Sequence, residues 1–158
     1  MAILPTISLP SNLIFFVSNL NSLVNIKLDQ ENYMVWKLQM RNALRANQLL
    51  DFVEGAIPKP VAVISDESGE MVPNPVLNEW LNIDYQLVSC LNATISSTIL
   101  PQIIGFEHAS DIWIHLEKRY ASHSLTHIHE IKLKLLNVSK EENLWIHILI
   151  LSRVVQTD

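Results

Sequence analysis

The chain has 158 residues, of which 49% are hydrophobic, and it carries a formal net charge of -5. This length fits one domain, or one domain plus a fragment, and the hydrophobic fraction allows a packed core and argues against wholesale disorder. Only three residues are glycine, which argues against glycine-rich phosphate loops, and the acidic balance argues against tight polyphosphate binding.

The first segment, residues 1–14, is expected to be a disordered leader, because it contains Pro5 and Pro10 and shows no helical period. The apolar cluster at residues 13–17 is too short to span a bilayer, which needs about 20 mostly apolar residues. No basic residue precedes Lys27, as a signal peptide would require. We therefore expect a flexible leader whose apolar patch docks on the domain.

The next stretch predicts the first long helix. Asn32 is a candidate N-cap. One apolar stripe follows it at spacings of three, four and four residues and consists of Tyr33, Trp36, Met40 and Leu44. The helix is expected to run to about Asn47, and residues 49–54 add a short helical turn that Gly55 ends.

An exposed loop is predicted at residues 57–75, which hold four of the seven prolines and an Asp-Glu-Ser-Gly run. Asn74 and Pro75 then resemble a cap followed by proline at the first helical position. The long helical stripe that follows consists of Leu77, Trp80, Leu81, Leu87, Val88, Leu91 and Ile95. Pro101 limits the next segment to a short helix that ends near Gly105.

The last third of the chain predicts further helices. Residues 110–120 and 124–138 each place apolar side chains on one face, and the tail from Glu142 is apolar almost all round, so it must be buried against something. No stretch shows sustained alternation of apolar and polar residues flanked by turn signals. The predicted fold class is all-α, an irregular bundle of five to seven helices.

Motifs for metal or covalent chemistry are absent. His123, His127 and His129 lie close together, but a structural zinc site usually needs four ligands with paired cysteines, and Cys90 is the only cysteine. The sequence contains neither His-Glu-x-x-His nor Gly-x-Ser-x-Gly. Cys90 falls on an apolar stripe and is interpreted as a core residue. We predict no enzymatic activity, no metal site and no cofactor.

Asp84 falls on the long apolar stripe, four residues after Trp80. A carboxylate there must be paired or hydrogen-bonded, because burying it without a partner costs on the order of several kcal/mol. It is either a catalytic acid with a raised pKa or a structural residue that makes an ion pair or a helix-capping contact with a base from another helix. The structural interpretation is favoured, because no second acid or histidine falls on a neighbouring predicted core stripe. The sequence does not identify the partner.

Charge is unevenly distributed along the chain. Residues 49–88 hold seven acids against Lys59 alone, and residues 27–48 hold four bases against two acids. A basic face on the first long helix consists of Lys37, Arg41 and Arg45. We expect this face to pair with the acidic stretch, within or between subunits, rather than to bind RNA. The four tryptophans each fall in a different predicted helix and are interpreted as core anchors rather than base-stacking platforms.

Four separated segments carry a family resemblance. They read KLDQENYMVWKLQMRNAL, LLDFVEGAIPKP, NPVLNEWLNIDYQLVSCLNATIS and ASDIWIHLEKRYAS. In order and spacing they resemble the N-terminal Gag region of plant copia-type LTR retrotransposons over residues 15–140. The structural anchors that this resemblance implies are Tyr33, Trp36, Met40, Trp80, Asp84, Leu91, Trp113, Leu116 and Tyr120.

The resemblance implies a capsid-like helical domain over residues 15–140, made in the cytoplasm as part of a polyprotein. Such proteins self-associate into a shell around the element's RNA, and the resemblance implies no catalysis, no membrane attachment and no small-molecule substrate. The family's RNA contact is usually a zinc knuckle of the Cys-x-x-Cys type that follows the capsid part. This chain lacks that motif, so we expect it to bind RNA only weakly.

Two departures from the family stand out. Residues 141–158 are over-apolar where the family continues with a polar helix, so we expect a divergent or truncated C-terminal helix there. His108 stands where a Ser or Thr helix cap is common. A domesticated adaptor that holds a host peptide remains the alternative function, and a nucleic-acid-binding fragment or an enzyme built around Asp84 is less favoured.

Overall fold

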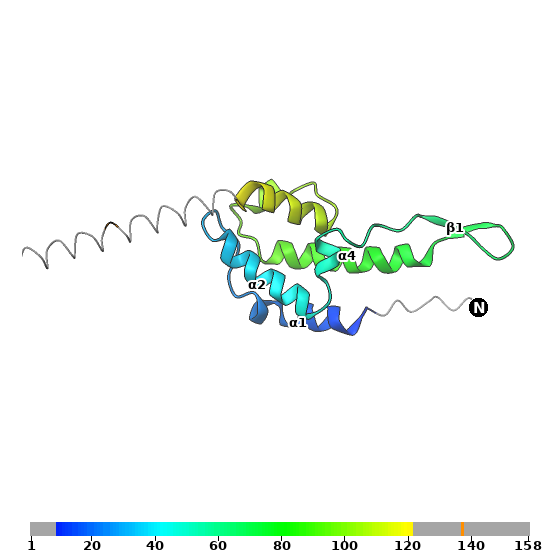
Figure 1. Cartoon of the computed structure of the whole chain (residues 1–158), viewed down its shortest axis with the longest axis horizontal. Helices are drawn as coiled ribbons and strands as arrows, with labels where there is room; N and C mark the ends of the chain where they lie inside the picture. The colour runs from blue at the N-terminus through cyan, green and yellow to red at the C-terminus, as the bar shows by residue number, and fades with distance from the viewer. Residues whose placement is uncertain (1–8, 122–136, 138–158) are drawn as a thin grey trace, which may run out of the picture. The chain divides into compact units, whose positions relative to one another are not determined.

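The computed structural model describes residues 9–121 and residue 137, and all structural statements below concern these residues. They form four α-helices, a short β-hairpin, the 3-10 turn η1 and a further helical segment at residues 109–121 (Figure 1). The elements are α1 Ser11–Leu23, α2 Tyr33–Ala46, α3 Leu50–Val53, β1 Val63–Ser65, β2 Met71–Pro73, α4 Pro75–Ala93 and η1 Leu100–Gln102. The all-α prediction is confirmed, with the hairpin as a small addition.

The predictions for the end of the chain lie largely outside the described residues. These are the helix at residues 124–138, the group of His123, His127 and His129, and the over-apolar tail at residues 141–158. Within that part, Asn137 alone is described, and it is helical and exposed.

Helix α1 corrects the prediction of a disordered leader up to residue 14, because it begins at Ser11. Leu13, Phe16 and Leu20 recur at helical spacing and are buried in the core. None of the Ser and Asn residues that interrupt the apolar run is buried. The exposed side of the helix also carries Ile14, Phe15 and Val17, so apolar residues occur on both sides and the helical period is obscured in the sequence.

The residues before α2 are held by hydrogen bonds within the segment and by hydrogen bonds to the residues after α4. Leu28 forms an isolated parallel bridge with Ile95, which ties this segment to the residues after α4. Asn32 occupies the N-cap position of α2, but its side chain makes no capping bond. It instead accepts the Asp29 N–H at 2.8 Å and donates to the Lys27 carbonyl at 2.9 Å. The predicted cap is thus at the right position, but its side chain closes the preceding turn.

The predicted loop at residues 57–75 is exposed over most of its length, yet it contains the antiparallel hairpin β1–β2. Val63 pairs with Pro73 and Ser65 with Met71. The tight turn between the strands depends on Gly69, whose φ of +87° favours glycine. Strands of three residues are too short to produce the alternation by which strands are recognised in sequence, and so the hairpin was missed.

Helix α4 starts as the sequence predicts. The Asn74 side chain accepts the Val76 N–H at 3.1 Å, and Pro75 follows in the first turn. After α4 the chain makes the η1 turn and then bends at Gly105, whose φ is +103°. This bend brings the helical segment at residues 109–121 back onto the core.

The core lies between α1, α2, α4 and residues 109–121. Its centre is a row of aromatic rings from α2 and the last described helical segment. The ring centroids of Tyr33 and Trp36 are 6.2 Å apart, those of Trp36 and Trp113 are 5.7 Å apart, and those of Tyr33 and Tyr120 are 6.1 Å apart. Tilted aromatic pairs at such distances add to the free energy gained by burying the rings.

Candidate functional site

The nine predicted anchor residues are all buried in the structure. They come from α2, α4 and the helical segment at residues 109–121. Eight of them are apolar or aromatic residues with ordinary core surroundings. The ninth, Asp84, is a carboxylate of which only 1% is exposed, so its partners decide whether it can take part in chemistry.

Both oxygens of Asp84 have partners from the start of the neighbouring helical segment. Oδ1 accepts the backbone N–H of Ala109 at 3.0 Å, and Oδ2 lies 2.7 Å from Nδ1 of His108. The first N–H groups of a helix have no partner within the helix, and a carboxylate at this end is favoured by their partial positive charge. Asp84 of α4 therefore supplies the cap that residues 109–121 do not supply for themselves.

Aromatic packing holds this cap in place. The His108 ring meets the Trp80 ring edge-on at a centroid distance of 5.4 Å. Trp80 Nε1 in turn donates to the carbonyl of Ile57 at 3.2 Å, so Trp80 is fixed at both ends. The result is a polar cluster of Trp80, Asp84 and His108 that joins α4 to the next helical segment.

The structural interpretation of Asp84 agrees with this geometry. The sequence argument considered only histidines on predicted core stripes and therefore left the partner open, and the structure identifies His108 as that partner. His108 precedes the helical segment and belongs to no apolar stripe, so periodicity does not detect it. The signal that was present is the unusual residue at the cap position, since a helix start without Ser, Thr, Asp or Asn lacks the usual side-chain acceptor of its own.

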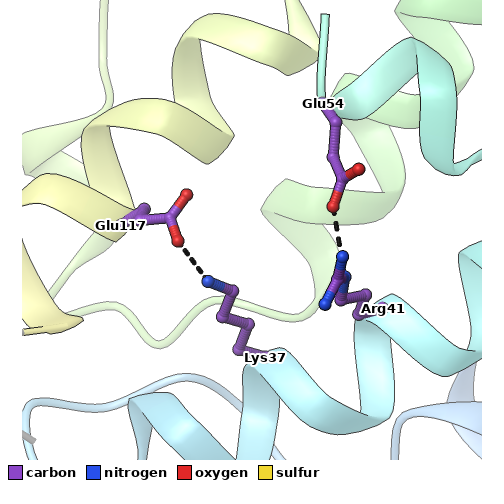
Figure 2. Close-up of polar contacts among 4 residues, drawn as sticks. All are labelled: Lys37, Arg41, Glu54 and Glu117. Atoms are coloured by element: carbon purple, nitrogen blue, oxygen red, sulfur yellow. Dashed lines mark hydrogen bonds and ion pairs between the residues drawn. The ribbon is translucent and has the colours of Figure 1, made fainter. Parts of the chain in front are cut away.

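The basic face of α2 is partly neutralised within the chain. Figure 2 shows Lys37 directed at Glu117 and Arg41 directed at Glu54, where Arg41 Nε and Glu54 Oε1 are 3.1 Å apart. Glu54 belongs to the predicted acidic stretch, but Glu117 does not. For Arg45, no ion pair is recorded among the described residues. Among the described residues, the expected pairing with the acidic stretch within one chain is thus found for Arg41.

Cys90 is buried in the core, as its place on an apolar stripe predicts. Burial raises the pKa of the Cys90 thiol from 9.0 to about 11, which keeps it protonated and unreactive near neutral pH. Within residues 9–121 no group of three metal-ligating side chains comes together. His123, His127 and His129 lie outside the described residues.

Among the exposed surfaces of the described residues, two combine apolar side chains at regular spacing. The α2 outer face consists of Met34, Leu38, Arg41 and Arg45, which lie at spacings of four, three and four residues. The hairpin face consists of Val63, Ser65, Met71 and Pro73, which the strand register places on one side of the β1–β2 ribbon. Among the described helices, none is long and apolar enough to cross a membrane.

Comparison with known proteins identifies a family and two relatives. Residues 40–155 match the family described as gag-polypeptide of LTR copia-type. The chain is 28% identical over 116 residues to the retrovirus-related Pol polyprotein from transposon RE2 of Arabidopsis thaliana, covering 73% of this chain and 8% of that protein. It is also 28% identical over 125 residues to the corresponding RE1 polyprotein of Arabidopsis thaliana, covering 75% of this chain and 8% of that protein. No solved structure matches.

Proposed function

The chain belongs to the copia-type LTR Gag polypeptide family, and we propose that it acts as a non-enzymatic structural protein that self-associates through helical surfaces. The observation that carries the proposal is the family match over residues 40–155. The chain spans only 8% of the length of the curated relatives that it matches, so their other activities are not assigned to it. In an intact element, the protein is made in the cytoplasm and forms particles around the element's RNA.

The absence of catalysis in this proposal is supported by the state of Asp84. Its two oxygens are engaged by Ala109 and His108, and the side chain is almost fully buried. A general acid or base needs a free position within hydrogen-bond reach of a substrate. Asp84 lines neither of two surface depressions, one beside Arg45 and one beside Cys90.

Self-association is supported by what the fold leaves exposed. Large apolar side chains remain open to solvent on α1, on α2 and along the hairpin, with Leu38 at 61% and Met71 at 67% exposure. These exposed apolar side chains are available for burial in an interface, and such burial provides the main driving force for association.

Binding of RNA by this chain alone is proposed to be weak. Part of the basic face is already paired with Glu54 and Glu117, and the chain has a net charge of -5. Since affinity for RNA depends on basic groups that replace phosphate counterions, binding should be lost as salt is raised moderately.

The test is co-purification of two copies of the full chain that carry different tags and are expressed together. The proposal predicts that capture of one tag retains the other copy after washing at moderate salt. Retention of a discrete host protein without the second copy would instead support the adaptor function. Retention of neither would contradict self-association.

A further inference from the structure

The β1–β2 hairpin is a sheet without a third strand. An isolated two-stranded hairpin is only marginally stable in water, and its outer strand edges are open to pairing. Figure 1 shows the hairpin extending past the start of α4 and away from the packed helices. Val63 and Met71 on the hairpin face are exposed, and within the described residues no element covers them. Such a ribbon gains stability if its apolar face is covered by a partner.

The α2 outer face is apolar at one end and basic at the other. Its N-terminal half presents Met34 and Leu38, and its C-terminal half presents Arg41 and Arg45. Four residues of a helix rise about 6 Å and eleven rise about 16 Å, so an apolar patch and a basic patch lie in succession along one stripe. Helix α2 itself contains no acidic residue.

The hairpin has the complementary order. Its strands carry the apolar hairpin face, and its turn carries Asp66, Glu67 and Glu70. Asp66 accepts the N–H groups of Ser68 and Glu70 and the Ser68 hydroxyl, so it shapes the turn. The hydroxyl of Ser68 and the backbone N–H groups hold the pKa of the Asp66 carboxyl below its ordinary value. No partner is recorded for the Glu67 and Glu70 side chains within residues 9–121.

We propose that the hairpin of one copy docks on the α2 outer face of a second copy. This inference rests on the proposed function and names the surfaces through which it works. The apolar hairpin face covers Met34 and Leu38, and the acidic turn reaches Arg45. On each surface the charged part lies at one end of the apolar part, and the two charges have opposite sign.

A second copy fits this role because both surfaces are exposed on the same chain and neither covers the other. The contact joins two different surfaces, so after a dimer forms one copy keeps a free α2 face and the other keeps a free hairpin. Contacts of this type close into rings or extend as open assemblies. They differ in this respect from a symmetric dimer, which has no free surface left.

The test uses two variants of the full chain, each of which blocks one side of the contact. Leu38→Asp places a carboxylate on the α2 outer face, and Met71→Asp places one on the hairpin face. Both positions are exposed, so the fold should be retained, which circular dichroism and thermal unfolding check. Ile104→Asp is the matched control, since Ile104 is 79% exposed and lies on neither surface. Sedimentation equilibrium measures the association of each protein and of mixtures.

The proposal predicts that each blocking variant alone associates at least about tenfold more weakly than the wild type and the control. An equimolar mixture of the two variants should form a dimer and nothing larger, because one intact hairpin and one intact α2 face remain. If the wild type associates and both variants do so equally well, the inference is overturned while the proposed function stands. The inference is also overturned if the mixture stays monomeric. A monomeric wild type removes the proposed function as well.

Discussion

The Asp84 carboxylate lies 2.7 Å from Nδ1 of His108. The same carboxylate accepts the N–H of Ala109, the first residue of the helical segment at residues 109–121. One buried acid from α4 thus caps another helix and holds the residue at its cap position. The family resemblance implied Ser or Thr at that position. Here the acceptor comes from a different part of the chain, so the side-chain cap of this helix depends on one residue of α4.

The first prediction concerns this joint. Asp84→Ala removes both acceptor oxygens from a buried site, and we expect it to lower the free energy of unfolding by about 3 kcal/mol. Asp84→Asn keeps an oxygen for the Ala109 N–H and should cost about half as much. Urea unfolding measures both. Glu79→Gln is the control, because Glu79 is an exposed acid on the same helix. A cost for Asp84→Ala no larger than that of the control would show that Asp84 is not a structural cap.

The second prediction tests α1 as a part of the domain. Phe16 is fully buried, whereas its neighbour Phe15 is 55% exposed. Phe16→Ala should therefore lower the free energy of unfolding by about 3 to 5 kcal/mol, and Phe15→Ala by less than about 1 kcal/mol. The two variants lose the same atoms from the same helix, so the difference reports burial alone. Equal costs, measured by urea unfolding, would mean that α1 does not pack on the core.

The third prediction concerns alkaline pH. Burial raises the pKa of Cys90 from 9.0 to about 11, and burial, together with the charge of Glu117, raises that of Tyr33 above 10.0. The unfolded chain releases these protons at lower pH than the folded chain. The stability from burying the neutral groups is therefore fully present below pH 9 and is lost as the pH rises through the pKa values of the folded state.

Urea unfolding at a series of pH values measures this loss. Cys90 should account for on the order of 2 kcal/mol of it between pH 9 and pH 11. Cys90→Ala removes that part of the pH dependence and leaves the part that is due to Tyr33. If the wild type and Cys90→Ala show the same pH dependence above pH 9, the thiol is not shielded from water in the way the structure shows.

The fourth prediction concerns the two ion pairs of Figure 2. Arg41 and Glu54 are both well exposed, so Arg41→Ala should change the free energy of unfolding by less than about 0.5 kcal/mol. Lys37 is more buried and lies 5.8 Å from the centre of the Tyr33 ring, so Lys37→Ala should cost about 1 kcal/mol. Thermal unfolding at low and high salt separates the two. A larger effect for Arg41 than for Lys37 would contradict this order.

The sequence predicted the helices with strong period and clear ends, and it missed features that depend on distant contacts. Helix α2 and helix α4 were found because their apolar residues recur at helical spacing and because Asn74 and Pro75 mark a start. Helix α1 was missed because exposed apolar residues such as Ile14 and Phe15 obscure the period. The hairpin was missed because three-residue strands carry no pattern of their own.

For the anchor residues and the Asp84 cluster, too, the sequence predicted burial and missed contacts between distant residues. Burial of residues such as Trp36 and Leu116 follows from their position on a stripe, and it needs no knowledge of the tertiary structure. The partner of Asp84 does not follow from any stripe, because His108 comes from 24 residues along the chain and from a cap position. The sequence shows the bases of α2, but whether each base pairs with an acid depends on how the helices pack. Among the described residues, Arg41 forms the expected pair, with Glu54 of the acidic stretch.

The measurement that tests the central claim most directly is sedimentation equilibrium of the full wild-type chain across a wide range of concentration. Self-association through surfaces left free by the fold predicts an average mass that rises continuously with concentration and exceeds that of a dimer. High salt should reduce the rise without abolishing it, because the contact is both apolar and charged. A mass that stays at the monomer value of 18.0 kDa throughout would contradict the account.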